Sequence, residues 1–318
     1  MRDDVLVCEI SGRRPGTKMN RPTEKYGFDC YRHLIVSNDH DGYETDWEIV
    51  DVPQDYREWY SENVRQSDKM WQAQMNRSYA LELTRQLGYR YCVQVDDNIF
   101  HLEIAYEIPL TDNVSKVYRT RFSEQYSGME LAYVELLCTA LECTNAGMAG
   151  CDMTTSDLGS TVMREGYVYS FFALDVERCR FPFQGGPEDD IEYRLKLAQQ
   201  GIPTVMLSPL RYGKVSERAV PDGSGCRKAY SELGLARGDA MRKLYGDIYS
   251  CGLSETNTTT AQTKTKKATF SHRLKPFNTG LIVKDARPIA KMLAEVLRDH
   301  ANQEFEDNVL EYERAYKS

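Results

Sequence analysis

Tyr89-Arg-Tyr-Cys-Val-Gln-Val95, followed at once by Asp96-Asp97-Asn98, is the stretch that decides how this chain folds. Its valines and aromatic residues predict a buried central strand. A strand in the middle of an α/β sheet carries whatever follows it to the carboxyl edge, where ligands bind. Two carboxylates and an amide there offer the hard oxygen ligands that Mg²⁺ or Mn²⁺ prefers. The alternative is a plain turn, because Asp and Asn favour turns.

The composition is that of an ordinary globular protein. The chain has 318 residues, 41% hydrophobic and 28% charged, enough for one large core or for one domain with an appendage. The sequence has no run of about 18 apolar residues, so no membrane span is expected. It opens without the apolar segment of a signal peptide, which predicts a cytoplasmic protein.

Charge and cysteine usage exclude two classes. The net charge of −8 argues against a molecule that binds nucleic acid with its whole surface, so any such contact requires a local patch. The nine cysteines form no CxxC pair and there are only five histidines, so neither a zinc site nor a His-rich metal site is expected. A cytoplasmic chain keeps its cysteines as thiols.

The opening segment predicts a further strand whose following loop lies at the same carboxyl edge of the sheet. Val5–Ile10 has the pattern of a strand, and it runs into the loop Ser11-Gly-Arg-Arg-Pro-Gly-Thr17. Glycine lets the backbone come close to a ligand. The paired guanidinium groups of Arg13 and Arg14 suit a diphosphate, which they can bind in bidentate fashion. A solvated turn is the alternative.

A helix is predicted immediately before the central strand. Its apolar spacing runs from Met70 to Leu87, and Gly88 is a typical residue after a helix end. Within it, the triplet Asn76-Arg77-Ser78 stands out, because Arg77 could reach the cleft formed by the acidic strand end. A surface arginine is the alternative.

A second acidic element follows later in the chain. Gly185-Gly-Pro-Glu-Asp-Asp190 opens a predicted helix that closes at Gly201 and leads into a strand, Pro203–Leu207. Proline and acids are favoured at a helix start on structural grounds alone. Between the two acidic elements, Asn145–Gly150 is predicted as a loop of small residues that could lie flat against a sugar or a base, and the alternative is a mobile connector.

The other predicted elements complete an alternating α/β pattern. The strands and helices expected are His33–Ser37, Glu48–Val52, a helix over Glu124–Cys143, a strand over Tyr167–Leu174, a helix over Arg227–Tyr245 and a last helix from Ala286 to about His300.

The carboxyl-terminal part has a different composition. Residues 254–267 are polar and low in complexity, which predicts a linker or lid. They run into a dense basic cluster made of Lys264, Lys266, Lys267, His272, Arg273 and Lys275. With Phe270 and Phe277 interleaved, this cluster could follow a phosphate backbone and stack on a base, or close over a bound phosphate. The predicted organisation is a domain over 1–250, a linker or lid over 251–280 and a helical extension over 281–318. The apolar positions of its tail, Asn302–Ser318, suit docking on the core or homodimerisation.

Taken together, the two acidic elements resemble the pattern of GT-A glycosyltransferases, over about residues 1–250. The finer resemblance is to the phage TET-associated DNA glycosyltransferases. It rests on Ser11 with Arg13 and Arg14, the Asn76-Arg77 helix before Val95-Asp96-Asp97, Gly147-Met-Ala-Gly150, and Glu188-Asp189. The fold it implies is Rossmann-like: a mixed sheet flanked by helices, with a helical carboxyl-terminal extension.

The resemblance implies transfer of a sugar from a nucleotide-sugar, with a UDP-sugar as the expected donor, to the hydroxyl of a 5-hydroxymethylpyrimidine in DNA. It implies a bacteriophage protein working in the cytoplasm of a bacterial cell. Mn²⁺ or Mg²⁺ would be held by Asp97 and Asn98, with His272 as a further ligand, although Asn98 stands where the pattern has a third acid. Asp189 would be the general base, with Glu188 and Asp190 as alternatives. The remaining residues implied are Ser11, Arg13, Arg14, Arg77 and Asp96 for the donor, Gly147, Met148 and Gly150 for the acceptor, and Lys266, Lys267, Arg273 and Lys275 as a basic patch.

Two other functions remain open. One is a glycosyltransferase that acts on a glycan or a protein. The other, from a different class, is a non-catalytic module that binds a nucleotide-sugar or a nucleic acid.

Overall fold

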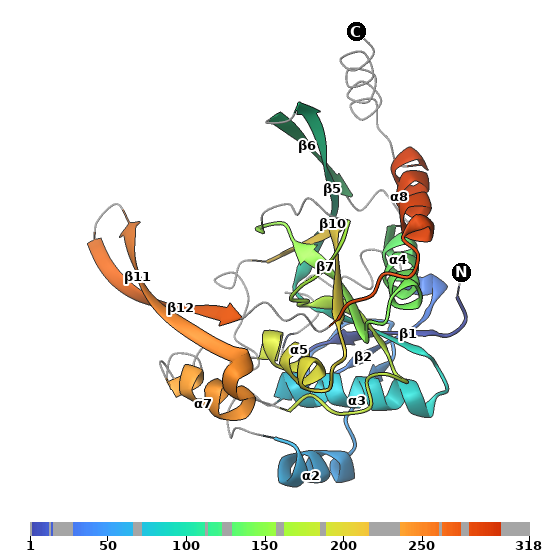
Figure 1. Cartoon of the computed structure of the whole chain (residues 1–318). Helices are drawn as coiled ribbons and strands as arrows, with labels where there is room; N and C mark the ends of the chain where they lie inside the picture. The colour runs from blue at the N-terminus through green and yellow to red at the C-terminus, as the bar shows by residue number, and fades with distance from the viewer. Residues whose placement is uncertain are drawn as a thin grey trace.

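The computed structural model describes residues 2–12, 14, 28–65, 72–111, 114–122, 129–156, 162–184, 189–215, 236–260, 263–274 and 280–299. Over these residues the chain has an α/β fold built on a mixed sheet with helices on both faces (Figure 1). The elements are β1 (Val5–Ile10), η2 (Phe28–Cys30), β2 (Arg32–Val36), β3 (Ile49–Val50), α2 (Gln54–Asn63), α3 (Gln72–Gln86), β4 (Tyr91–Asp96), β5 (Ile99–Thr111), β6 (Val114–Phe122), α4 (Met129–Cys143), β7 (Met148–Met153), β8 (Met163–Glu165), β9 (Phe171–Asp175), α5 (Asp189–Gln199), β10 (Thr204–Lys214), α7 (Ala236–Tyr245), η3 (Gly246–Ile248), β11 (Tyr249–Thr260), β12 (Thr263–Leu274) and α8 (Arg287–Asp299).

The order of the strands creates a switch point in the main sheet. The described strands follow the order β3-β2-β1-β4-β9-β7-β10-β5-β6, and β8 pairs with β10. β1 is parallel to β2 and to β4, whereas β9 is antiparallel to both of its neighbours. The predicted α/β class with a mixed sheet is therefore confirmed. Because β2 and β3 lie on one side of β1 and β4 on the other, the strand order reverses at β1, and α/β proteins bind ligands outside the carboxyl ends of the strands at such a point.

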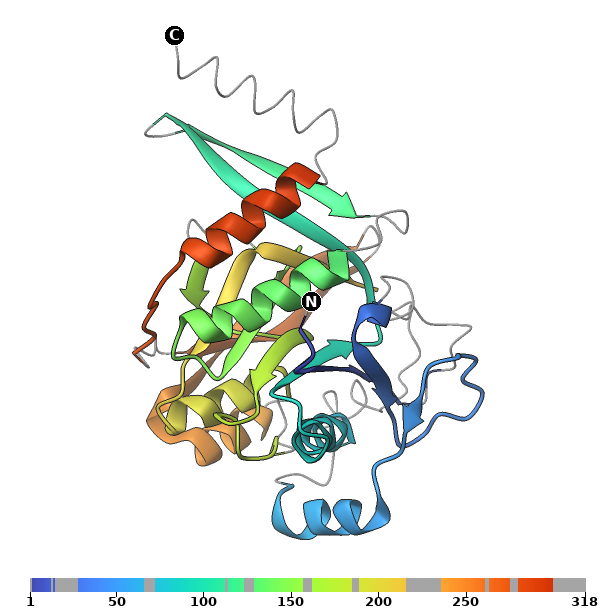
Figure 2. The same ribbon diagram turned by 90° about the vertical axis from the view of Figure 1, so that its right-hand side faces the viewer.

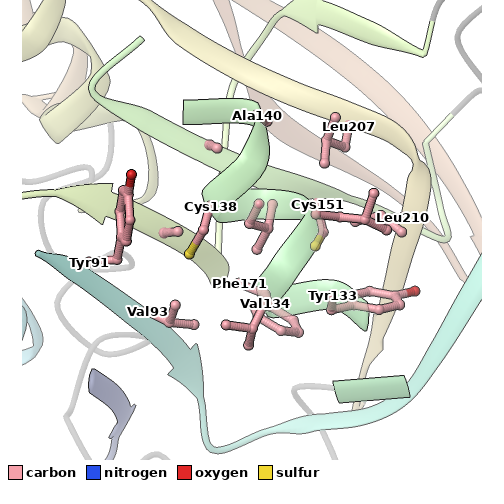
Figure 3. Close-up of a cluster of buried hydrophobic side chains, with 14 of the residues drawn as sticks. Tyr91, Val93, Tyr133, Val134, Cys138, Ala140, Cys151, Phe171, Leu207 and Leu210 are labelled. Atoms are coloured by element: carbon pink, nitrogen blue, oxygen red, sulfur yellow. The ribbon is translucent and has the colours of Figure 1, made fainter. Parts of the chain in front are cut away.

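One face of the sheet is covered by α4. Successive side chains of a strand point to opposite faces, so Val93 of β4 and Phe171 of β9 point toward α4, where they pack with Tyr133 in a fully buried cluster (Figure 3). α8 lies beside α4 (Figure 2) and adds Ile289 and Leu293 to the same cluster. The predicted last helix thus packs on the main core, whereas the tail Asn302–Ser318, for which docking is predicted, lies outside the described residues. Homodimerisation through the C-terminal helix stays a prediction.

The opposite face is covered by α2, α3 and α5. Cys8 of β1 and Cys92 of β4 point to this side, where Tyr60, Tyr79 and Tyr193 of the three helices complete a second buried cluster. The predicted helix before β4 is confirmed as α3, and Gly88 follows it with φ of 80°. Glycine has access to this left-handed conformation without steric cost. No helix in the described ranges is long and apolar enough to cross a membrane.

The segment predicted as a polar linker is folded. β11 and β12, each 12 residues long, pair in an antiparallel ribbon from Tyr249↔Leu274 to Thr260↔Thr263. The prediction for 254–267 is a polar linker or lid without regular structure, whereas residues 254–260 and 263–267 belong to paired strands, which threonine favours. A role as a lid stays a prediction. After Ile99, β5 and β6 form a further antiparallel hairpin.

The predicted loop over Asn145–Gly150 is also wrong, because its second half is part of a central strand. Met148 and Gly150 belong to β7, where they pair with Leu174 and Phe172 of β9. An added Cβ at Gly150 would lie 2.0 Å from Val168 Cγ1 and 3.1 Å from the carbonyl oxygen of Phe171. The small residue is thus needed for close packing of the chain over β7.

We expect Gly150→Ala to lower the free energy of unfolding by roughly 1–3 kcal/mol, because the methyl group forces Val168 away from the strand. Urea unfolding measures this change. Gly12→Ala is the matched control, since its Cβ would meet nothing within 4 Å. Equal stability of the two variants would show that the packing at Gly150 relaxes freely.

Candidate functional site

The ends of β1 and β4 meet at the switch point of the sheet. Ile10, the last residue of β1, pairs with Asp96, the last residue of β4. Immediately beyond them, Ser11 Oγ donates a hydrogen bond of 2.7 Å to Asp97 Oδ2. The carboxylates that the sequence placed at the carboxyl edge therefore lie there, next to the loop that follows β1.

Two residues of the loop after β1, Ser11 and Arg14, bind the carboxylate of Asp97. Its side chain is 2% exposed, and Arg14 Nη1 contacts its other oxygen, Oδ1, at 2.5 Å. Because the hydroxyl proton of Ser11 is used on Asp97, the 2.7 Å contact between Ser11 Oγ and Tyr43 must have the tyrosine as donor. The hydroxyl of Tyr43 also accepts a hydrogen bond of 3.1 Å from the backbone N–H of Arg14. Tyr43 thus orients both groups that hold Asp97.

Asp96 is held by two cations from distant parts of the chain. Arg77 Nη2 of α3 lies 2.5 Å from Oδ1, and Lys214 Nζ at the end of β10 lies 2.9 Å from Oδ2. The guanidinium of Arg77 is fixed further by Gln94 Oε1 at 3.4 Å and by the ring of Phe172, whose centroid is 5.4 Å away. Gln94 and Asp96 both point to α3, since they are two residues apart on β4.

Three consecutive residues of α3 join three segments of the site. Asn76 Nδ2 donates to the carbonyl oxygen of Ser11 at 3.0 Å, and Arg77 binds Asp96. Ser78 Oγ accepts the N–H of Phe183 at 2.8 Å. Phe183 lies just before the second acidic element, so one turn of helix positions the loop after β1, the end of β4 and the approach to α5.

The two carboxyl groups experience opposite electrostatic environments. For Asp96, burial opposes ionisation, but the charges of Lys214 and Arg77 outweigh it and hold its pKa well below the usual range. For Asp97, burial prevails over the attraction of Arg14 and the hydrogen bond from Ser11, and its pKa is raised. Asp96 is therefore a strongly ionised counter-ion, whereas the ionised form of Asp97 is costly.

The oxygens at this edge do not by themselves form a complete site for a divalent cation. Both oxygens of Asp96 and of Asp97 already contact cations or a hydroxyl group, and the buried Asn98 Oδ1 has no hydrogen-bond partner. No group of three or more His, Cys, Asp or Glu suited to a metal occurs in the described residues. The residues present thus do not fit Mn²⁺ or Mg²⁺ without rearrangement of these ion pairs, and binding at Asp97 and Asn98 stays a prediction.

The second acidic element begins a helix that faces α3 across a pocket. α5 starts at Asp189, as the sequence predicts. Arg77 of α3 and Arg194 of α5 line the same small pocket, together with aromatic side chains that include Phe172 and Tyr193. At 1.5 Å per residue, Asp189 lies about 7–8 Å along the helix axis from Arg194. The two elements are thus neighbours in the fold.

The glycines predicted to contact the acceptor are not beside the acidic residues. Gly147 precedes β7 and is buried, and an added Cβ there would lie 2.6 Å from Ile202 Cγ2. β7 and β4 both pair antiparallel with β9, so they run in the same direction, and Gly147 lies at the edge of the sheet where these strands begin. Met148 and Gly150 are inside the sheet. Packing explains the two glycines, whereas Met148 lines the small pocket that also contains Arg77 and Arg194.

Some of the predicted site residues cannot be placed. Arg13, Glu188 and Lys275 lie outside the described residues, and so do the side chains of Asp189, Asp190, Lys266, Lys267, His272 and Arg273. The structure adds Tyr43 and Gln94, and it pairs Asp96 with Lys214, which the sequence left between a contact to donor phosphates and a surface charge. Lys214 reaches the site because β10 continues past Leu207, where the strand was expected to end, and Lys214 pairs with Ile99 just after Asn98. No local pattern marks Tyr43.

No protein-family model and no curated protein sequence matches this chain.

We expect Arg77→Met to lower the free energy of unfolding by about 1.5–3 kcal/mol, because the partly buried Asp96 loses its closest cation and keeps only Lys214. Combining it with Asp96→Asn should restore part of the loss, which a double-mutant cycle in urea measures. Arg242→Met provides the matched control, since Arg242 pairs with Asp239 on the surface of α7 and such pairs contribute about 0–1 kcal/mol. Additive effects of Arg77→Met and Asp96→Asn would contradict the pairing.

The opposite pKa changes predict opposite pH dependences for two Asp→Asn variants. The stabilisation from ionised Asp96 is present above its unfolded pKa, about 4, and is lost as pH falls through the lower folded value. The stability that Asp96→Asn loses relative to the wild type should therefore grow as pH rises toward about 4 and stay constant above it. The pKa of Asp97 is raised, so Asp97→Asn should gain stability relative to the wild type as pH rises above about 4. Urea unfolding between roughly pH 2 and 7 checks both, and parallel profiles would refute the assignment.

Proposed function

We propose that this protein is a glycosyltransferase that moves a sugar from a nucleotide-sugar, expected to be a UDP-sugar, to the hydroxyl of a 5-hydroxymethylpyrimidine in DNA. The observation that carries the proposal is the arrangement at the switch point. Two carboxylates hold Arg14, Arg77 and Lys214 together outside the carboxyl ends of β1 and β4. With Asp96 and Asp97 ionised, these five groups carry a net positive charge, which suits an anionic ligand at a place where α/β folds bind nucleotides.

The cations explain how such a site could assist sugar transfer. When the bond between the anomeric carbon and the diphosphate breaks, negative charge builds on the departing phosphate oxygen. Cationic groups already fixed in place stabilise this charge without reorganising at the moment of reaction. In the proposal, Arg14 and Lys214 contact the diphosphate, since their side chains are 19% and 24% exposed, whereas Arg77 and Asp96 position the ensemble.

The acceptor hydroxyl needs a general base, and we propose Asp189 for this role. The start of α5 is joined to the donor side through the pocket between Arg77 and Arg194, and through the bonds of Ser78 to Phe183. Glu188 and Asp190 are the neighbouring alternatives. A divalent cation at Asp97 and Asn98, with His272 as a further ligand, would supply additional positive charge, and it remains a separate proposal.

The test is incubation of hydroxymethylated DNA with a panel of UDP-sugars, read by mass spectrometry of the nucleosides. We expect a hexose-sized mass increase on the modified base and none on DNA without hydroxymethyl groups. Asp97→Asn should reduce the rate by about 10²–10³ and Asp189→Asn by about 10²–10⁴. Parallel reactions with a chelator and with added Mn²⁺ or Mg²⁺ test the cation proposal separately.

Asp239→Asn is the matched control, since this carboxylate is 77% exposed on α7, and it should leave the rate unchanged. Wild-type turnover in Asp97→Asn or Asp189→Asn would overturn the corresponding role. Transfer to a glycan or protein but not to DNA would show that the acceptor is a glycan or protein in place of modified DNA. Binding of a UDP-sugar with no transfer to any acceptor would support the non-catalytic module instead.

A further inference from the structure

The ribbon formed by β11 and β12 stands apart from the main sheet. It extends away from the other elements of the fold (Figure 1). At its base, Tyr249 is buried with Leu195 of α5 and with Met241 and Tyr245 of α7. At about 3.4 Å per residue, strands of this length span about 40 Å. The ribbon is thus a long element anchored at one end beside the helix that carries Asp189.

The register of the ribbon divides its residues between two faces. Residues directly opposite each other in an antiparallel pair share a face, and the face alternates along each strand. The first face, called the hydroxyl face below, holds Ser250, Gly252, Ser254, Thr256, Thr258, Thr260, Thr263, Thr265, Lys267, Thr269, Ser271 and Arg273. The second holds Tyr249, Cys251, Leu253, Glu255, Asn257, Thr259, Lys264, Lys266, Ala268, Phe270, His272 and Leu274.

The charges of the two faces differ. The whole protein carries −8, yet the ribbon has four Lys or Arg residues and a single carboxylate, Glu255. That carboxylate belongs to the second face, as do the aromatic residues of the ribbon. On the hydroxyl face, Lys267 and Arg273 are accompanied only by Ser, Thr and one glycine. Lys, Arg, Ser and Thr are the residues that donate to phosphate oxygens in complexes with DNA.

We propose that the hydroxyl face of the β11–β12 ribbon binds the phosphate backbone of a nucleic-acid duplex, with the ribbon lying in the major groove. That groove admits a two-stranded ribbon. A single strand would call for aromatic side chains among the cations, on which its bases stack, and here Phe270 lies on the opposite face from Lys267 and Arg273. The identity of the duplex as the modified acceptor DNA rests on the proposed function, but the binding itself does not.

The experiment measures binding of the full chain to a duplex of roughly 24 base pairs, twice what a 40 Å ribbon covers at about 3.4 Å per base pair. Lys267→Gln combined with Arg273→Gln removes both charges of the hydroxyl face. Each lost phosphate contact should lower the slope of log K against log salt by about 0.9, so we expect a decrease of about 1.8 and weaker binding at all salt concentrations.

Lys264→Gln combined with Lys266→Gln is the matched control, because it removes two charges from the second face of the same strand. It should change the slope by less than half as much. Equal losses in the two pairs, a larger loss in the control, or preferential binding of the wild type to single-stranded DNA or to anionic lipid vesicles would overturn the inference. Unfolding midpoints of both double variants should match that of the wild type, which separates lost contacts from lost folding.

Binding of a UDP-sugar, measured in parallel, distinguishes this inference from the proposed function. If Lys267→Gln combined with Arg273→Gln weakens duplex binding and leaves UDP-sugar binding unchanged, the effect belongs to the ribbon. Duplex binding through the hydroxyl face without sugar transfer would leave the inference standing and refute the proposed enzyme activity.

Discussion

The ion pair between the buried Arg77 and the partly buried Asp96 is the constraint on which the candidate site depends. A guanidinium is expensive to remove from water unless its charge and its donors find partners. Here Asp96 supplies the charge, Gln94 an acceptor and Phe172 a ring face, while Lys214 neutralises the second carboxylate oxygen. Arg77 belongs to the middle of α3 and Asp96 to the end of β4, so this arrangement fixes how the helix crosses the sheet. The position of α3 relative to the ends of β1 and β4 follows from it.

The same turn of helix explains why distant segments converge. Asn76 and Ser78, on either side of Arg77, bind the loop after β1 and the segment that leads to α5. Any shift of α3 would therefore move the loop after β1, the end of β4 and the segment that leads to α5 together. The carboxylates at this edge act first on the chain's own cations, which they hold close to one another against their mutual repulsion. This is the physical basis for considering the edge an anion site. In the β11–β12 ribbon, the register places Lys267 and Arg273 with serines and threonines on one face, while Lys264, Lys266 and the single carboxylate, Glu255, belong to the other.

Much of the fold could be predicted from local patterns. The strands β1 and β4, the helix α3 with Gly88 after it, and the start of α5 at Asp189 all agree with the sequence interpretation. Hydrophobic periodicity and the residues that begin or end a helix are local properties. Predictions based on them are therefore correct where the segment has the burial that its pattern implies. The errors have the same origin. Small residues in Asn145–Gly150 suggested a loop because the sequence does not show that Val168 packs directly on the strand. The threonine-rich stretch suggested a linker because the sequence does not show which strand it pairs with.

The sequence by itself determined the chemistry at the carboxyl edge: which strand ends in acids, which loop carries Arg14, and which helix carries Arg77. These are properties of single segments. Only the tertiary structure decided the partners. It placed Lys214 on Asp96 because β10 turns to pair with β5, and it brought Tyr43 to Ser11. It also gave two adjacent aspartates opposite pKa changes. Burial and the number of nearby cations set those changes, and both depend on residues far apart in the chain.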